Sequence, residues 1–244
     1  MAMEVKGLGM PPREFAQPEW DGRALGAGTL LLYAEQGLGD TIQFMRYAPL
    51  AAARCGTLVV EYQPQLAGLL GSVAGAARIV ARGESLPSFD AQLPLMSLPR
   101  VFDTTPDNVP WNGPYLRADA RRVEPLARLE HVALYSLQWG EGRSQLTSLP
   151  PDMKVVDFGD RIREFGDMGA LVACLDVVIS VDSSVTHLAG ALGVPARLLL
   201  AYAPDWRWLL ERGSSPWYPS VRLFRQASDR RWEGVVRRVA AELA

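Results

Sequence analysis

The sequence is poor in the residues that build metal sites and disulfide frameworks. Its 244 residues include two cysteines and two histidines, namely Cys55, Cys174, His131 and His187, and these show no metal-ligand spacing. Both cysteines stand in apolar surroundings, so we expect buried free thiols in a reducing compartment. The sequence therefore predicts no metal and no bound cofactor.

Long apolar runs are also missing. No run approaches the roughly 20 residues that a membrane span requires, and the first fifteen residues, MAMEVKGLGMPPREF, have no apolar core of the signal-peptide type. We therefore expect a cytoplasmic protein, and peripheral attachment to a membrane surface stays open.

An excess of positive charge is a further absence. The net charge is −2 and the sequence pI is about 5.8, whereas a nucleic-acid partner demands a basic patch. We therefore expect no nucleic acid as a partner. The 48% of hydrophobic and 21% of charged residues are ordinary for a soluble globular protein, and the length suggests one large or two small domains.

What the sequence does contain is an alternation of apolar strands and helical patterns. We predict strands at 28–34, 57–62, 78–81 and 89–95, a short strand at Tyr115, and further strands at 131–138, 154–158, 177–181 and 197–202. We predict helices at 40–54 with a kink or restart at Pro49, then at 64–70, 168–175, 184–192 and 232–243. The last helix has an apolar side made by Val235, Val236, Val239 and Leu243.

This alternation predicts an α/β protein with parallel sheets that are covered on both faces. The strand count suggests two βα units in series, with a polar, proline-containing junction near residues 117–125. We therefore predict two domains, at residues 1–119 and 120–244.

The first candidate site is the turn Gln36-Gly37-Leu38-Gly39-Asp40, which follows the first strand and opens a helix. Ligands bind at the carboxyl ends of strands in such sheets, and glycines permit close approach and positive φ. Asp40 is placed to accept a proton from a substrate hydroxyl. A carboxylate at this point also caps helices, and taken alone the cap is the better interpretation.

The second candidate is Asp182-Ser183-Ser184-Val185-Thr186-His187, between an apolar strand and a helix. Backbone N–H groups at a helix start, with two serine hydroxyls beside them, form a site for a diphosphate. His187 shares a helix face with Ser184 and is able to donate to a phosphate oxygen. The alternative, weighed evenly, is that Asp182 or Ser183 caps the helix and His187 is packed and satisfied.

Weaker candidates lie elsewhere in the chain. Trp206, Trp208 and Trp217 form an aromatic cluster that we assign to the core, and Asp205 beside them either binds a sugar hydroxyl or caps the next helix. Two basic residues, Arg143 and Lys154, meet either phosphate or solvent. We find no Walker loop, no hydrolase triad order and no zinc pattern.

Three blocks in the same order carry a resemblance. They are YAEQGLGDTIQFMRYAPLAA, VVISVDSSVTHLAGALGVP and APDWRWLLERGSSPWYPSVRLFRQ. From about Phe15 to its end the chain resembles the glycosyltransferase domain of many bacterial tetratricopeptide-repeat proteins. That domain is similar to glycosyltransferase family 9, the ADP-heptose:lipopolysaccharide heptosyltransferases. The resemblance implies the GT-B architecture, in which two Rossmann-like domains face a cleft.

The resemblance also implies roles for both candidate sites. Gly39 and Asp40 match the family's Gly-Asp pair, whose aspartate acts as base on the acceptor hydroxyl. Asp182, Ser183 and His187 match the family's diphosphate motif. The implied reaction is an inverting glycosyl transfer without a metal, from a nucleotide-diphosphate sugar to a glycan, lipid-linked or protein acceptor. Two further residues, Gln138 and Phe158, resemble positions near the nucleotide.

Two departures from the family matter. The sequence contains no tetratricopeptide repeats, which usually precede this domain and would recruit a protein partner. The C-terminal domain also lacks its first βα unit, since on the order of thirty residues or more, including a basic loop, are missing near residues 120–130. The alternatives to a glycosyltransferase are therefore a degenerate relative that only binds a nucleotide sugar or a protein, and, more weakly, a sugar-nucleotide epimerase.

Overall fold

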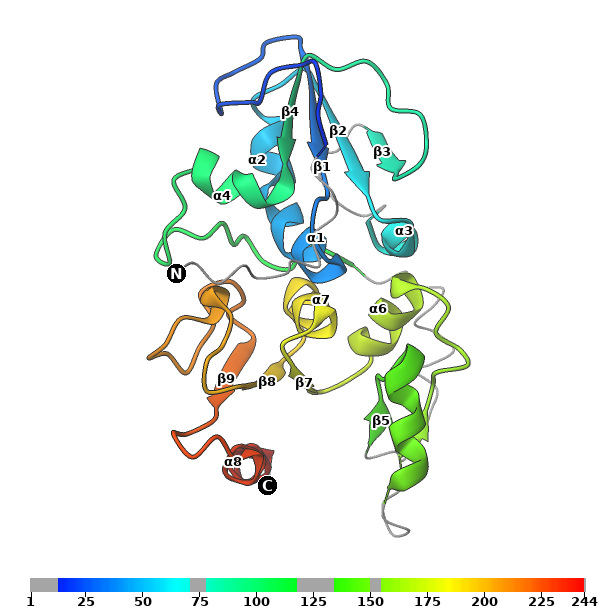
Figure 1. Cartoon of the computed structure of the whole chain (residues 1–244), viewed down its shortest axis with the longest axis vertical. Coiled ribbons are helices and arrows are strands. Elements are labelled where there is room, and N and C mark those ends of the chain that lie inside the picture. The colour runs from blue at the N-terminus through cyan, green and yellow to red at the C-terminus, as the bar shows by residue number, and fades with distance from the viewer. Residues whose placement is uncertain (1–12, 71–77, 118–133, 150–154, 244) are drawn as a thin grey trace.

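The computed structural model describes residues 13–70, 78–117, 134–149 and 155–243, and it is an α/β structure with parallel sheets (Figure 1). The first sheet contains β1 (Thr29–Tyr33), β2 (Thr57–Tyr62), β3 (Arg78–Ala81) and β4 (Ala91–Pro94) in the order β3-β2-β1-β4. All three of its strand pairs are parallel. The four strands predicted for this half are therefore confirmed.

The centre of this sheet is buried on both faces. In β1, Leu30 and Leu32 belong to the main hydrophobic core, while Leu31 packs in a second cluster with Val59 and Val80. The near-continuous apolar strand is thus explained by its two covered faces, as expected for a parallel sheet.

The helix that follows β1 restarts at its proline, as predicted. It is divided into α1 (Leu38–Phe44), a 3-10 turn (Met45–Tyr47) and α2 (Ala48–Ala52), which carries Pro49 in its first turn. Proline is tolerated there because the first N–H groups of a helix have no partner within it.

Short helices complete the first half. Pro64–Leu66 is a 3-10 turn that leads into α3 (Ala67–Leu70), and Leu95–Ser97 leads in the same way into α4 (Leu98–Val101). The strand predicted at Tyr115 is wrong. The Tyr115 N–H donates to the carbonyl of Ala191, so this segment follows the end of a helix instead of joining a sheet.

The second half contains two separate parallel sheets. One pairs β5 (Tyr135–Ser136) with β6 (Val156–Asp157). The other has the order β7-β8-β9, from β7 (Val178–Val181), β8 (Ala196–Leu200) and β9 (Val221–Arg225). Strand β9 was not predicted, although Val221 and Leu223 alternate with polar residues and both are buried.

The predicted helices of this half are present as α6 (Phe165–Ala173), α7 (Ser184–Leu192) and α8 (Trp232–Leu243). A 3-10 helix at Gly140–Ser148 was not predicted. Gly193 ends α7 with a φ of 75°, in the left-handed conformation that glycine favours. The closing helix α8 is confirmed, and on its predicted apolar side Val235 and Val239 are buried whereas Val236 and Leu243 are exposed.

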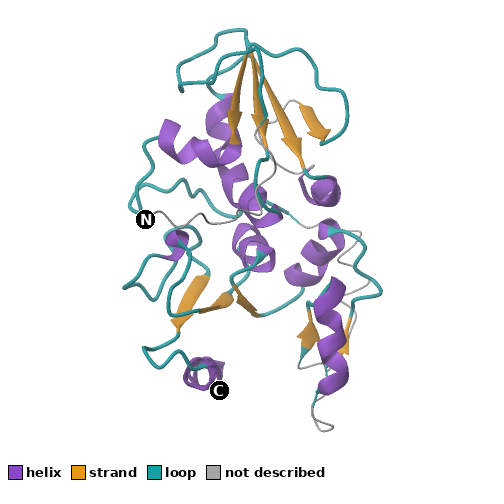
Figure 2. Cartoon of the chain, in the orientation of Figure 1, coloured by secondary structure: helices purple, strands orange, loops and turns teal. Residues whose placement is uncertain are grey.

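The two halves are in contact. Helix α1 packs against α7, and α3 packs against α6, so helices lie between the upper sheet and the strands of the second half (Figures 1 and 2). The domain boundary predicted at residues 119–120 lies outside the described residues. Within the described ranges, no helix is long and apolar enough to cross a membrane.

The cysteines are free, as predicted, but Cys55 and Cys174 are only partly buried. Burial raises the pKa of both thiols. The expectation of buried thiols therefore holds only in part.

Candidate active site

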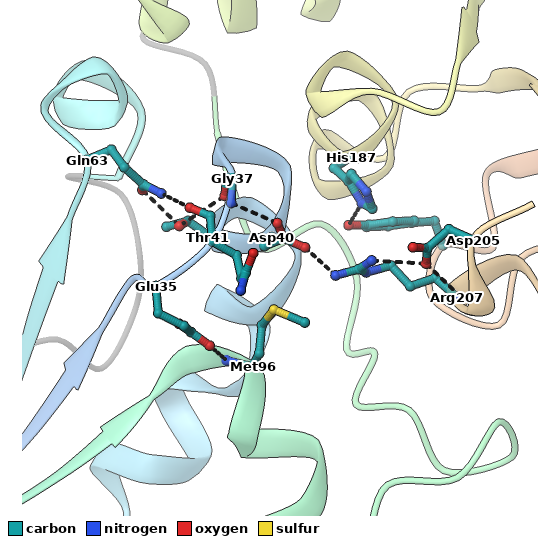
Figure 3. A network of polar contacts seen from close by, with 11 residues as sticks. Glu35, Gly37, Asp40, Thr41, Gln63, Met96, His187, Asp205 and Arg207 are labelled. Carbon is teal, nitrogen blue, oxygen red and sulfur yellow. Dashed lines mark hydrogen bonds and ion pairs between the residues drawn. The ribbon is translucent and has the colours of Figure 1, made fainter. Parts of the chain in front are cut away.

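The turn after β1 is held in shape by three hydrogen bonds (Figure 3). Asp40 Oδ2 accepts the Gly37 N–H with 2.9 Å between the two atoms, so the carboxylate does cap the start of α1. At the end of β2, the Gln63 side chain donates to the carbonyl of Gln36 and accepts from the Thr41 hydroxyl, both at 2.8 Å. These bonds fix the position of the carboxylate relative to the sheet.

The glycines of the turn serve packing. The φ of Gly37 is −68°, and among the described residues neither it nor Gly39 has a positive φ, so that part of the prediction is wrong. A Cβ added to Gly39 would lie 2.8 Å from Cδ2 of His187 and 3.3 Å from Cα of Ser184. Gly39 therefore lets α1 approach the first turn of α7, which joins the two candidate sites in space.

The start of α7 has no side-chain cap. Ser183 is the N-cap residue, but its hydroxyl does not cap the helix and lies 3.0 Å from the hydroxyl of Ser180. The Thr186 hydroxyl donates to the Val181 carbonyl at 2.9 Å. The N–H groups of Thr186 and His187 donate to the Ser183 carbonyl, so those of Ser184 and Val185 precede the first bonds of the helix. They keep the partial positive charge that favours a negative ligand.

An arginine links this region to Asp40. The guanidinium of Arg207 forms an ion pair with Asp40 Oδ1, although the two residues are 167 positions apart in the sequence. It also donates to Asp205 Oδ1 over 2.9 Å, and Asp205 accepts the Arg207 N–H at 3.0 Å as the cap of a short 3-10 helix, Trp206–Trp208. The capping alternative for Asp205 is therefore confirmed. Arg207 was not among the predicted site residues, although it lies in the block APDWRWLLERGSSPWYPSVRLFRQ.

His187 is packed inside the protein. Its Nδ1 lies 3.0 Å from the Tyr218 hydroxyl, and its ring stacks on that of Trp208 with 5.4 Å between the ring centres. Burial lowers the pKa of His187 to about 3, and the charges of Arg207 and Arg46 add to the effect. The ring is thus neutral at pH 7. Direct donation from His187 to a phosphate oxygen stays a prediction.

We expect this buried imidazole to make the protein less stable in mild acid. The unfolded chain takes up a proton below pH 6.5 that the folded chain excludes, so stability falls as the pH drops. From pH 7 to pH 5 the loss from this group is about 2 kcal/mol. Urea unfolding at both pH values measures it, with His187→Gln as the comparison. If the variant loses as much stability as the wild type, His187 is not the cause.

The other predicted site residues lie in different surroundings. Asp182 is exposed as a residue, yet burial of its carboxyl group raises the pKa, and the carboxylates of Asp205 and Asp40 raise it further. Gln138 is exposed and its N–H donates to the Ser136 hydroxyl at 3.2 Å. Phe158 is buried and stacks on Tyr135. A position beside a nucleotide stays a prediction for Gln138 and Phe158.

The remaining candidates can also be placed. The core assignment is confirmed for Trp208 and Trp217, whereas Trp206 is 56% exposed and the assignment is wrong for it. Arg143 forms ion pairs with Asp157 and Asp160, and Lys154 lies outside the described residues. In the part of the chain that the structure describes, no three metal-binding side chains gather into a site.

Glu35 is a second site residue that was not predicted, although it directly precedes the turn Gln36-Gly37-Leu38-Gly39-Asp40. It follows β1, where β1 and β4 run side by side, and its Oε1 accepts the Met96 N–H at 3.0 Å. Burial raises the pKa of this carboxyl group, and the negative charge of Asp40 adds to the effect. Strand β1 is where the order of the sheet reverses, and such switch points bind ligands in open α/β sheets.

Comparison with solved structures places the fold among glycosyltransferases of family 9. The family 9 glycosyl transferase from Veillonella parvula matches with a TM-score of 0.62 and 8% identity, over 85% of this chain and 88% of that one. The E. coli heptosyltransferase WaaC with ADP matches with a TM-score of 0.56 and 11% identity, over 88% and 97%. E. coli ADP-heptose LPS heptosyltransferase II matches with a TM-score of 0.55 and 11% identity, over 88% of this chain and 100% of that one. At these identities the likeness concerns the fold.

Sequence comparison gives weaker evidence than the comparison of structures. No family model matches the chain. Protein FlbA from Caulobacter vibrioides is 26% identical over 288 residues, which are 92% of this chain and 48% of FlbA, so the chain spans about half of that relative. Since 92% of 244 residues is about 224, about 64 of the 288 aligned positions have no counterpart here.

Proposed function

We propose that this chain is a glycosyltransferase that transfers a sugar from a nucleoside-diphosphate donor to a hydroxyl group of a glycan, a lipid-linked molecule or a protein, in the cytoplasm. One observation carries the proposal: the carboxylate of Asp40 and the uncapped start of α7 lie together. Gly39 packs against Ser184 and His187, and Arg207 joins Asp40 to the 3-10 helix at Trp206–Trp208. The family 9 fold and the ADP held by one of its solved members support the choice of donor.

In the proposed reaction the acceptor hydroxyl gives its proton to Asp40 while its oxygen forms a bond to the anomeric carbon of the donor. The bond from that carbon to the diphosphate breaks, and its electron pair leaves with the phosphate oxygen. The N–H groups at the start of α7, around Ser183 and Ser184, stabilise the negative charge that develops there. Attack opposite to the leaving group inverts the sugar configuration, and the proposed step uses no metal.

The two candidate sites have different proposed roles. The turn Gln36-Gly37-Leu38-Gly39 places the base and faces the acceptor. Asp182, Ser183, Ser184 and His187 surround the diphosphate, and Gln138 and Phe158 lie on the nucleotide side. Tetratricopeptide repeats of a longer protein, which accompany the domain that this chain resembles, are the proposed means of recruiting a protein acceptor.

A charge placed at the first residue of α7 tests the diphosphate site. We expect Ser184→Asp to weaken the binding of ADP by about tenfold or more, because the carboxylate repels the diphosphate. An acidic residue is otherwise favourable at a helix start, so the fold should keep its stability. Calorimetric titration with ADP, UDP and GDP measures the affinity. The matched control is Ser184→Asn, which has the same shape without the charge.

The two variants separate the outcomes of this titration. Weak binding by Ser184→Asp with near-normal binding by Ser184→Asn supports the site. Equal affinities of the two variants for the preferred nucleotide would exclude α7 as the place of the diphosphate.

A second function, nucleotide-sugar or protein binding without catalysis, is favoured by the split sheet. In the doubly wound order 3-2-1-4-5-6, a first strand of this half would lie between β5 and β7, and these strands belong to separate sheets. Ile179 and Val181 of β7 are 45% and 54% exposed. A protein that binds nucleoside diphosphates but never turns over a donor sugar would favour this function.

A further inference from the structure

Arg207 is a nearly buried cation between two acids. Its side chain is 10% exposed, against 23% for Asp40 and 35% for Asp205. Its guanidinium donates to both carboxylates, and its central carbon lies 4.9 Å from the centre of the Trp206 ring. Its Nε has no hydrogen-bond partner among the described residues. The guanidinium thus has donor capacity left, at the junction of the two candidate sites.

The ion pair occupies the oxygen that the proposed base needs. Asp40 Oδ2 is engaged by the Gly37 N–H at the start of α1, which leaves Oδ1 for the acceptor proton. Oδ1 is the atom that pairs with Arg207. As long as this pair is closed, both carboxylate oxygens already accept a hydrogen bond, and an acceptor hydroxyl group has to share Oδ1 with the guanidinium.

The acids near the start of α7 would repel a bound diphosphate unless a cation offsets their negative charge. The carboxylates of Asp40 and Asp205 act on Asp182, as does the positive charge of Arg207. A diphosphate brings further negative charge into this group of acids. A planar guanidinium is suited to it because it donates two parallel hydrogen bonds to phosphate oxygens.

We propose that Arg207 is the cation that receives the donor diphosphate, and that it is held by Asp40 until the diphosphate arrives. Binding of the donor then draws the guanidinium away from Oδ1 and frees the base. The donor therefore binds before the acceptor is activated, because its diphosphate first has to release Asp40 Oδ1 from Arg207. This inference rests on the proposed function and adds a residue and an order of events to it.

Pyrophosphate binding tests the exchange without any need for turnover. We would titrate wild type, Asp40→Asn, Arg207→Gln and the double variant with inorganic pyrophosphate in a calorimeter. Asp40→Asn should bind about three to ten times more tightly than wild type, because a competing anion is gone. Arg207→Gln should bind about ten times more weakly or worse. In the double variant the gain from Asp40→Asn should vanish.

Comparison of the wild type, the two single variants and the double variant distinguishes this inference from simpler explanations. If Asp40→Asn leaves the affinity unchanged, Asp40 does not hold Arg207 and the inference is overturned. A gain that persists in the Arg207→Gln background also overturns it, since Asp40 then acts by repulsion alone. Absence of pyrophosphate and ADP binding in all four proteins would overturn the proposed function as well.

A conservative variant guards against loss of folding, because the Arg207 side chain is only 10% exposed and pairs with two acids. Arg207→Lys keeps the charge without the planar fork. We expect an affinity between those of wild type and Arg207→Gln, at an unchanged melting temperature. Wild-type affinity in both Arg207 variants would show that Arg207 has only a structural role.

Discussion

Asp40→Asn is expected to lower the rate of sugar transfer by about 10²–10⁴-fold, the usual contribution of a general base. The amide keeps the size of the side chain and cannot take up the acceptor proton. Since the proposed diphosphate site lies on α7, the variant should bind the donor at least as tightly as wild type does. The measurement is the release of nucleoside diphosphate from a sugar donor in the presence of acceptor, together with the donor affinity of the same protein.

The matched control is Asp176→Asn. Asp176 is exposed and precedes β7, whereas the proposed site follows that strand, so the two carboxylates lie at its opposite ends. We expect normal turnover from this variant. Turnover by Asp40→Asn at the wild-type rate would mean that Asp40 is only the cap of α1.

The second large effect concerns Arg46, which is 4% exposed and joins the two halves of the chain. Its guanidinium donates to the carbonyls of Gln43 and Trp217, at 2.9 Å and 2.5 Å, and lies 4.6 Å and 5.0 Å from the ring centres of Tyr218 and Tyr115. Within the described ranges no carboxylate pairs with it. Carbonyl groups and aromatic faces thus solvate this buried charge.

Arg46→Ala is expected to reduce the free energy of unfolding by about 3–5 kcal/mol, because it leaves a cavity and removes the partners of two carbonyls. Arg46→Met, which fills most of the space, should lose less. Urea unfolding gives the values. The control is Arg100→Ala, whose exposed pair with Glu19 should contribute less than about 1 kcal/mol. A similar small loss for Arg46→Ala would contradict a structural role for the buried charge.

Local signals allowed much of the fold to be predicted. The apolar runs of β1 and β2, the restart at Pro49 and the stop at Gly193 each depend on a few neighbouring residues. The prediction at Tyr115 was wrong because its N–H is satisfied by α7, a long-range contact that its own neighbours do not encode.

The candidate site could be predicted in part. Both sequence blocks were identified, and the packing of Gly39 on α7 brings them together. The ion pair between Asp40 and Arg207 could not be foreseen, since it joins residues that only the folded chain places side by side. The buried state of His187 depends in the same way on Tyr218 and Trp208, which lie far along the sequence.

The central claim is that one place in the molecule both binds a diphosphate and holds the base. A crystal structure with bound ADP tests it most directly. We expect the diphosphate within hydrogen-bond distance of the N–H groups at the start of α7, with the guanidinium of Arg207 turned from Asp40 toward a phosphate oxygen. A diphosphate bound away from α7, with the pair between Asp40 and Arg207 unchanged, would contradict the account.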